Sequence, residues 1–270
     1  LRLYRFKEAF SRDFVTEFIR RFNLTSADYI LDPFAGMGTT LFTAMLRGIP
    51  SVGVDRLPVA VFVARTLPKF FLVRRHQLRE TYARLLDQVD KLKPAPAAMD
   101  VPLMRKAFEP RILDRLLRWK AGIDQLRQPL KDVFLLLFFS TLEECSSASN
   151  DGQFLRLKPN KQPAYPDAAL LRKVLHAEHD LDQVTSLPLR AEPQVYLGDA
   201  RELSRLSLSR QPTAVITSPP YLNRYDYTRS YCLELCTHFV SNFQELRKIR
   251  REILRSHIES AVLEDEVLPH

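Results

Sequence analysis

The sequence predicts an α/β fold: a parallel sheet with helices on both faces, interrupted by an all-helical insertion. Near the start of the chain, and again after about residue 190, short apolar segments typical of buried strands alternate with helical segments. Between about residues 67 and 189 this strand pattern disappears and long helical patterns take over. Five of the seven glycines fall in the proposed sheet region, namely Gly36, Gly38, Gly48, Gly53 and Gly198.

The first part of the chain alternates between helices and strands. Residues 13–22 (DFVTEFIRRF) place three phenylalanines and an isoleucine on one helical face. Residues 29–36 (YILDPFAG) indicate a buried strand that ends in a turn, and residues 39–48 (TTLFTAMLRG) indicate a helix that stops at a glycine. Residues 51–55 (SVGVD) indicate a second buried strand, followed by a helix over residues 58–67. This order predicts parallel strands joined by helices.

The insertion is expected to be helical throughout. Its clearest helical patterns cover residues 78–92, 109–127 and 129–144. A polar loop at residues 146–153 (SSASNDGQ) and a segment with three prolines at 158–167 (KPNKQPAYPD) separate its helices.

The α/β pattern resumes near residue 194. Residues 194–199 (QVYLGD) indicate a strand, residues 200–207 a helix, and residues 213–217 (TAVIT) a further strand. The sequence Ser-Pro-Pro-Tyr follows at once. Two adjacent prolines cannot continue a sheet ladder, so the chain leaves the sheet here in an extended form. A charged helix is expected over residues 229–257.

Composition limits the classes of function. A formal charge of +8 favours a polyanionic partner, although charge alone is weak support. The three cysteines, Cys145, Cys232 and Cys236, form no CxxC pair, which suits a reducing cytosol, and no metal site is readable. The apolar run at 133–139 is too short to span a bilayer, and residues 1–10 lack signal-peptide features. We therefore expect a cytoplasmic protein that does not bind membranes.

The segment DPFAGMGTT, residues 32–40, is the first candidate binding site. Gly36 and Gly38 stand where a strand turns sharply into a helix, whose free N–H groups can receive an anionic or polar ligand. Leu41 replaces the small residue of the dinucleotide-binding pattern, and the triphosphate-binding Gly-Lys-Ser/Thr is absent. Asp32 would repel a pyrophosphate and suits a cationic ligand.

S-adenosylmethionine fits this chemistry, because it carries a sulfonium and an ammonium group beside a carboxylate and an adenosine. Asp55 can accept hydrogen bonds from the ribose hydroxyls, and Asp199 from the adenine amino group. Each aspartate alone could equally be a capping residue, but three at successive strand ends favour a ligand site. The expected cofactor residues are Asp32, Pro33, Phe34, Ala35, Gly36, Gly38, Thr39, Thr40, Asp55, Asp199 and Ala200.

DPFAGMGTT together with TSPPY (217–221) resembles the DNA amino-methyltransferase family. Residues 5–22 are similar to that family's N-terminal cofactor segment and add Phe10 to the expected cofactor residues. The resemblance implies a Rossmann-like methyltransferase sheet, with residues 1–66 plus 190–258 as the catalytic domain and 67–189 as an insertion that could contact nucleic acid. It implies methyl transfer to cytosine N4 or adenine N6 of DNA, as in restriction-modification. The Ser form of the tetrapeptide favours cytosine N4.

Ser-Pro-Pro-Tyr suits this reaction chemically. The lone pair of an exocyclic amine is delocalised into the base until acceptors hold its hydrogens. Ser218 Oγ and the Pro219 carbonyl are the proposed acceptors, Pro220 helps to hold that carbonyl outward, and Tyr221 would stack on the flipped base. Direct transfer needs no cysteine nucleophile. The alternative, a rigid loop that closes a strand, is the weaker interpretation beside a cofactor loop.

Other residues are expected to contact the substrate. Flanking nucleotides could meet Asn223, Arg224 and Tyr225, or these residues could order the loop. Basic helices could bind phosphates, or they could be solvated faces with interspersed acids; the two interpretations have equal weight. The basic residues concerned are Arg105, Lys106, Arg111, Arg115, Arg118 and Lys120, with a second cluster at 246–255 (LRKIRREILR).

Three alternatives stay open at this stage. The strands that complete the family's sheet after Ser-Pro-Pro-Tyr are not visible, and residues 258–270 cannot supply them. Either the chain is truncated, or a second polypeptide completes the sheet, or the activity is lost. An RNA base methyltransferase and a non-catalytic subunit that binds cofactor or DNA are the alternative functions.

Overall fold

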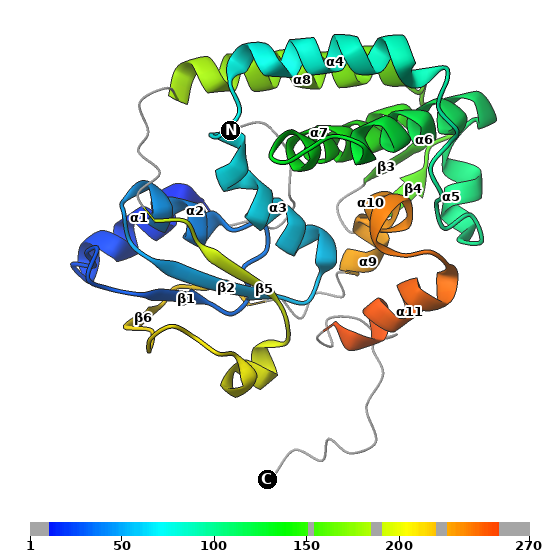
Figure 1. The fold of residues 1–270 in the computed structure, drawn as a ribbon. Coiled ribbons are helices and arrows are strands. Elements are labelled where there is room, and N and C mark those ends of the chain that lie inside the picture. The colour runs from blue at the N-terminus through cyan, green and yellow to red at the C-terminus, as the bar shows by residue number, and fades with distance from the viewer. Residues whose placement is uncertain (1–10, 151–153, 185–190, 220–225, 254–270) are drawn as a thin grey trace.

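The computed structural model describes residues 11–150, 154–184, 191–219 and 226–253 (Figure 1). The strands are β1 (Ile30–Asp32), β2 (Ser51–Asp55), β3 (Ala148–Asn150), β4 (Leu155–Leu157), β5 (Gln194–Leu197) and β6 (Ala214–Val215). The α-helices are α1 (Arg12–Arg21), α2 (Thr39–Leu46), α3 (Pro58–Phe70), α4 (Arg75–Val89), α5 (Pro102–Ala107), α6 (Pro110–Asp124), α7 (Leu130–Cys145), α8 (Pro166–Val184), α9 (Tyr227–Ser230), α10 (Cys232–Glu234) and α11 (Phe243–Glu252). A 3₁₀ helix, η1 (Ala200–Arg205), and a π-helical turn, η2 (Leu235–Phe239), complete the elements.

The sheet is parallel, with strand order β5-β2-β1-β6, as the α/β prediction requires. Helices α2 and α3 pack on one face, α2 against β1 and β2 and α3 against β2 and β5. On the other face Leu31 and Val52 pack against Leu203 of η1 and Leu208. Because strands β1 and β2 are covered from both sides, their residues are buried without alternation along the strand. The sheet is therefore a Rossmann-like layer flanked by helices.

Gly53 allows α2 to lie close to β2. A Cβ atom at this position would stand 2.5 Å from Leu41 Cδ1 and 2.8 Å from Ala35 Cβ, inside van der Waals contact. Leu41 is buried in α2, and Ala35 is buried in the loop before it. The absence of a side chain in the middle of this strand is therefore required by packing rather than by backbone angle.

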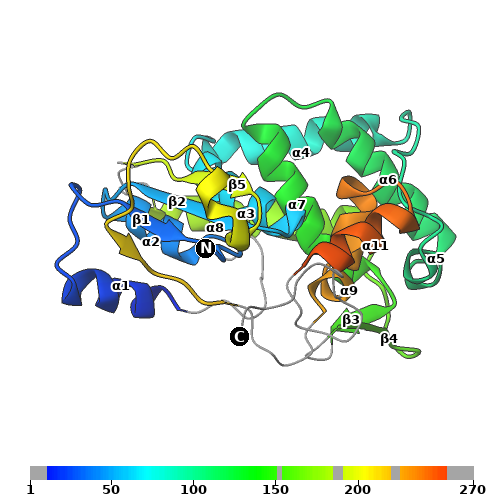
Figure 2. The ribbon, with the colours of Figure 1, turned by 90° about the horizontal axis from the view of Figure 1, so that it is seen from below.

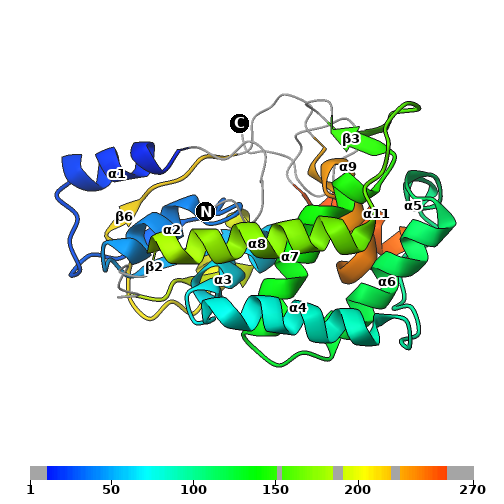
Figure 3. The same cartoon turned by 90° about the horizontal axis from the view of Figure 1, so that it is seen from above.

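The helices of the insertion form a second layer beside the sheet (Figures 1 and 3). The apolar run of α7 lies at its centre, with Phe134, Phe138 and Phe139 fully buried. Helices α3, α6 and α8 contact α7, and α4 packs against α6 and α8. One hydrophobic core runs through this layer and includes residues of α3 and of the C-terminal elements from α10 to α11. Helix α3 thus joins the sheet to the helical layer.

The sequence predicted an all-helical insertion, and this prediction is wrong. Strands β3 and β4 form a small antiparallel hairpin in the region expected to be a polar loop. The Glu143 side chain accepts hydrogen bonds from Asn150 N and Ser149 Oγ, and Ser146 Oγ accepts one from Ala148 N. These side-chain hydrogen bonds stabilise a non-helical backbone, and the helical pattern of the sequence gives no indication of them. Helices α5 and α8 were also not singled out from the sequence.

The prediction of a single helix over residues 229–257 is wrong. The chain forms α9, α10 and the π-helical turn η2, becomes extended at Val240, and starts again as α11. Asn242 caps α11, because its side chain accepts a hydrogen bond from Glu245 N at 3.0 Å, and Glu245 Oε2 accepts one from Ser241 N at 2.8 Å. The arrangement is related to a capping box, but Glu245 reaches the backbone of Ser241 instead of that of the capping residue Asn242. The helix predicted at 200–207 is the 3₁₀ helix η1.

No helix in the described ranges has both the length and the apolar character that crossing a membrane demands.

We predict that Gly53→Ala lowers the free energy of unfolding by about 1–3 kcal/mol, because the added methyl overpacks the interface between β2 and α2. Urea unfolding followed by circular dichroism measures this. Gly198→Ala is the matched control, since its Cβ would lie 3.2 Å from a single flexible Val54 methyl group. Equal midpoints for Gly53→Ala and the wild type would refute the packing argument.

Candidate cofactor and catalytic site

Three aspartates lie at one edge of the sheet. Asp32 ends β1, Asp55 ends β2, and Asp199 follows β5 by two residues. These three strands are parallel neighbours, so their carboxyl ends point to the same edge. Gly198 N donates a hydrogen bond to the Asp55 carbonyl at 3.0 Å, which continues the pairing of β2 and β5 up to Asp199. The edge predicted from the sequence is therefore formed, and it is the ligand-binding edge of open parallel sheets.

The turn after β1 is bound to the end of β2. Gly36 has φ +52° and Gly38 has φ +87°, backbone angles in the left-handed region that other residues rarely adopt. Gly36 N donates a hydrogen bond to Asp55 Oδ2 at 2.8 Å, and Ala35 N donates to the Val54 carbonyl at 2.9 Å. The turn then enters α2 at Thr39. The geometry holds the turn against β2.

Asp55 is a constrained carboxylate. Besides the bond from Gly36, its Oδ1 accepts a hydrogen bond from Leu57 N at 2.8 Å. Burial raises the pKa of Asp55 to about 6, against the stabilising backbone hydrogen bonds, and the neighbouring Asp32 contributes in the same direction as burial. The side chain therefore changes charge below neutral pH and is largely ionised above it.

Asp32 is fully buried and only half satisfied. Its Oδ1 accepts hydrogen bonds from Thr217 Oγ1 at 2.7 Å and from Phe34 N at 3.2 Å. Its Oδ2 is buried and has no hydrogen-bond partner among the residues that the structure describes. Burial raises the pKa of the Asp32 carboxyl, opposing the hydrogen bond from Thr217. A buried carboxylate oxygen without a donor is costly, so this atom fits a ligand that brings a positively charged donor.

The corner that carries Ser-Pro-Pro-Tyr is attached to the cofactor turn. Strand β6 pairs with β1, and Thr40 Oγ1 of α2 donates a hydrogen bond to the Ile216 carbonyl at 3.3 Å. The Thr217 hydroxyl donates to Asp32, one residue before Ser218. Ser218 is half-buried, and within the described part of the chain its hydroxyl has no hydrogen-bond partner; Pro219 is exposed. The two residues proposed as amine acceptors, Ser218 and Pro219, thus directly follow a residue that is bound to the buried Asp32.

Several predicted residues lie outside the described residues. They are Phe10 of the N-terminal cofactor segment, Pro220 and Tyr221 of the tetrapeptide, and the substrate residues Asn223, Arg224 and Tyr225. Their roles stay predictions.

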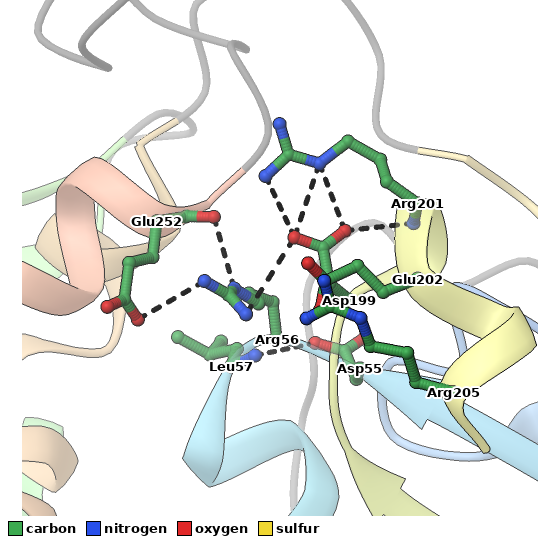
Figure 4. A network of polar contacts seen from close by, with 8 residues as sticks. All are labelled: Asp55, Arg56, Leu57, Asp199, Arg201, Glu202, Arg205 and Glu252. Atoms are coloured by element: carbon green, nitrogen blue, oxygen red, sulfur yellow. Dashed lines mark hydrogen bonds and ion pairs between the residues drawn. The ribbon is translucent and has the colours of Figure 1, made fainter. Parts of the chain in front are cut away.

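Asp199 takes part in a network of charged residues (Figure 4). Its carboxylate binds the Arg201 guanidinium, with Nη2 to Oδ2 at 2.8 Å, and accepts a hydrogen bond from Arg201 N at 2.9 Å. Arg56 Nη1 lies 3.7 Å from Asp199 Oδ2. Hydrogen bonds from Arg201 lower the pKa of Asp199, although burial opposes them. Asp199 also caps η1, which begins at Ala200. A purine amino group would share this carboxylate with two arginines.

Arg56 is a residue of this edge that the sequence analysis missed. It joins Asp199 to the end of α11, because its Nη2 lies 3.3 Å from Glu252 Oε2 and its Nε donates to the Glu252 carbonyl at 3.2 Å (Figure 4). The available signal was its position directly after Asp55, at the end of a parallel strand. The partner Glu252 is far along the chain and could not have been inferred.

Cysteine and metal chemistry are not organised in the described residues. All three cysteines are buried, and burial raises the pKa of the Cys145 thiol to about 12, so this thiol resists forming the nucleophilic thiolate. No group of His, Cys, Asp and Glu side chains in these residues gathers in a way that could hold a metal ion.

The fold and the site define a class of protein. A parallel sheet with a glycine turn after its first strand, acidic residues at three neighbouring strand ends and an extended Ser-Pro corner beside them is a Rossmann-like methyltransferase architecture. Members of this class use S-adenosylmethionine as methyl donor.

Comparison with known proteins agrees with that class, because the chain is similar to type II methyltransferases over nearly all of its length. It is 30% identical to the type II methyltransferase M.BsoBI of Geobacillus stearothermophilus over an alignment of 286 positions, which covers 95% of this chain and 56% of the relative. It is 28% identical to the type II methyltransferase M.AvaI of Anabaena variabilis, over 96% of this chain and 58% of the relative. A shorter match, 33% identical over 92 residues, is to the type II methyltransferase M.MjaII of Methanocaldococcus jannaschii.

The chain thus spans little more than half the length of M.BsoBI and M.AvaI. No family model and no solved structure matches it.

We predict that Asp55 makes the folded state less stable as pH rises from about 4 to about 6. Its pKa is higher in the folded state than the ordinary 3.8, so the folded protein binds this proton more tightly, and stability is lost as the proton leaves. The fall continues through the folded-state pKa and levels off roughly one pH unit above it, where the folded protein has also lost the proton. The measurement is urea unfolding of the wild type and Asp55→Ala at several pH values. The stability of the wild type relative to the variant should fall across this window; a constant difference would contradict the raised pKa.

Proposed function

We propose that the protein transfers a methyl group from S-adenosylmethionine to the exocyclic amino group of a base in DNA, with cytosine N4 favoured over adenine N6, as in restriction-modification. The observation that carries the proposal is the hydrogen bond from Thr217 to Asp32. It joins the turn that would hold the cofactor to the corner that would hold the amine. The homology to type II methyltransferases supports the same activity.

The residues at the sheet edge fit the cofactor. The unpartnered Oδ2 of Asp32 would accept a hydrogen bond from the ammonium group of the methionine part, which removes its cost of burial. The turn packs closely against α3, since a Cβ on Gly38 would stand 3.0 Å from Ala64 Cβ, and it places the start of α2 at the sheet edge. Asp55 would accept from the ribose hydroxyls. The cofactor supplies, when bound, an electrophilic methyl carbon on a sulfonium.

Ser218 and Pro219 would prepare the amine for attack. The lone pair of the exocyclic nitrogen is delocalised into the ring, and it becomes available when the nitrogen turns pyramidal. The free Ser218 hydroxyl oxygen and the Pro219 carbonyl would each accept one N–H hydrogen and so favour the pyramidal form. This stabilisation grows toward the transition state, where it increases the rate rather than the affinity.

Tyr221 would hold the base after it leaves the duplex. Removal of a base from its stack costs a few kcal/mol, and an aromatic side chain recovers part of this cost by stacking. The preference for cytosine N4 rests on the serine at position 218, because the family resemblance associates this form with cytosine enzymes and the aspartate form with adenine enzymes. Incubation with labelled cofactor and mixed DNA, followed by nucleoside mass spectrometry, identifies the methylated base.

We predict that S-adenosylmethionine binds with a micromolar Kd and that Gly36→Val and Asp55→Ala abolish this binding. Valine is strained at a φ of +52° and fills the turn, and alanine removes both the ribose acceptor and the anchor of the turn. Calorimetric titration measures the affinity. Gly48→Val is a control outside the site, since Gly48 has φ +72° but follows the far end of α2. Wild-type affinity in both site variants would overturn the cofactor assignment.

We predict that Ser218→Ala lowers kcat about tenfold or more while the Kd for DNA changes less than threefold, because the lost hydrogen bond acts mainly in the transition state. Tyr221→Ala should abolish or strongly reduce transfer and weaken DNA binding by roughly 1–3 kcal/mol. Neither variant should change the affinity for the cofactor. Single-turnover methylation of DNA measures the rates; wild-type rates in both would leave Ser-Pro-Pro-Tyr as a structural corner only.

A further inference from the structure

Helix α11 presents a strip of basic side chains on its outward face. Its inner face contains Leu246, which is buried. Gln244, Arg247, Lys248 and Arg251 are exposed and follow helical spacing, and the exposed Glu245 lies beside them in the first turn. In the described part of the chain, none of these three basic side chains has a hydrogen bond or an ion pair. They form one strip, because positions three and four residues apart are neighbours on a helix.

The acidic residues of α11 are used elsewhere. Glu245 accepts hydrogen bonds from Ser241 N and Asn242 Nδ2 at the start of the helix. Glu252 binds Arg56 at its end. Neither carboxylate therefore neutralises the strip. Arg250, which faces inward, binds Asp226 and Thr228 instead of solvent.

The other basic cluster indicated by the sequence is largely neutralised within the fold. Arg115 binds Asp167 and Asp90, Arg118 binds Asp114, and Lys120 is buried against Asp124. Hydrogen bonds from Arg115 to Asp167, at 2.7 Å, and from Trp119 Nε1 to the same carboxylate tie α6 to α8. For these three residues the ion pairs favour a structural role over phosphate binding. Arg105, Lys106 and Arg111 of this cluster are exposed.

Two contacts place the strip beside the proposed site. Arg56, adjacent to Asp55, binds the last residue of α11. Arg250 binds Asp226 and Thr228, which begin the segment after Ser-Pro-Pro-Tyr. In Figures 1 and 2, α11 lies next to α9, beyond the strand ends that carry the aspartates. The helix is thus attached both to the cofactor edge and to the segment that follows the catalytic corner.

We propose that the strip formed by Arg247, Lys248 and Arg251 binds the phosphate backbone of the DNA whose base enters the site. The proposal rests on the proposed function for the identity of this polyanion. Three unneutralised cations on one rigid face match the spaced negative charges of a nucleic-acid backbone, and contacts of this kind give affinity and position without reading sequence. The strip would hold the duplex while the corner receives the base.

A purely structural role is the competing explanation. Cations in the last turn of a helix interact favourably with its dipole, which stabilises the helix by a few tenths of a kcal/mol to about 1 kcal/mol. That role affects folding and leaves the salt dependence of DNA binding unchanged. The two roles are therefore separated by the slope of binding against salt.

The test compares Arg247→Gln/Arg251→Gln with Arg47→Gln/Arg84→Gln. Both pairs remove two exposed arginines and change the net charge equally. Arg47 directly follows α2, at the end opposite to the helix start beside the site, and Arg84 lies on α4, which Figure 1 shows across the helical layer from α11. The probe is a fluorescein-labelled mixed-sequence duplex of about 30 base pairs, long enough for several phosphate contacts. Anisotropy gives the Kd between 50 and 200 mM salt, roughly the range over which counterion release dominates.

We expect the α11 pair to weaken binding about tenfold and to reduce the slope of log K against log salt by about 2, since each lost phosphate contact removes about 0.9. The control pair should stay within about twofold of the wild type, with an unchanged slope. Equal losses in the two pairs, or a wild type that binds no duplex at low salt, would overturn the proposal. Thermal unfolding of both pairs checks that the α11 variant is folded.

Methyl transfer by the same proteins separates this proposal from the proposed function. A wild type that methylates DNA while the α11 pair binds like the control would refute the strip alone. A wild type that binds duplex through α11 but transfers no methyl group would refute the activity and leave the strip intact.

Discussion

The buried carboxylate of Asp32 is the constraint on which the site depends. It ends the central strand β1 and accepts a hydrogen bond from Thr217, which follows the neighbouring strand β6, so it fixes the separation of the cofactor turn and the catalytic corner. Within the described residues its second oxygen has no hydrogen-bond partner. A group of this kind reduces stability until a donor arrives, and a site that keeps one is prepared for a charged ligand. Stability and binding are therefore in opposition at this residue.

At the end of the next strand, β2, the stability of the fold and the charge needed for binding are likewise opposed at Asp55. Two backbone N–H groups hold its carboxylate, and one of them belongs to the glycine turn. The bond from Gly36 gives the turn its shape, whereas burial opposes the charge that the cofactor would use. The turn, the strand end and the titrating group are thus one unit, in which a change of charge also changes the anchor of the loop.

The helical layer contributes to the site indirectly. The C-terminal elements from α10 to α11 pack into the core around α7, so the segment after the catalytic corner is anchored in the insertion rather than on the sheet. Arg56 then connects the end of α11 back to the strand ends. This arrangement explains how residues separated by nearly 200 positions surround one edge. It also gives the insertion a positioning role, independent of contact with nucleic acid.

The sequence by itself determined the features that depend on local patterns. Alternating apolar strands and helices indicated the parallel sheet, and two glycines after an apolar strand marked the turn, because few other residues adopt positive φ. The three strand-end aspartates followed from the rule that parallel strands share a carboxyl edge. Local pattern also misled, since the charged segment after residue 229 was interpreted as one helix although the side chain of Asn242 caps the start of a new one.

Only the tertiary structure decided which side chains meet. The bond between Thr217 and Asp32, the unpartnered oxygen of Asp32 and the link from Arg56 to Glu252 join distant positions. The same holds for charge, because Arg115 of α6 is neutralised by Asp167 of α8, which is distant in sequence, whereas Arg247, Lys248 and Arg251 of α11 have no ion pair in the described part of the chain. Helix and strand periodicity predict which secondary structure a residue belongs to and which face of it the residue occupies. The electrostatic state of a residue depends on partners that folding brings from elsewhere in the chain, and these leave no local signal.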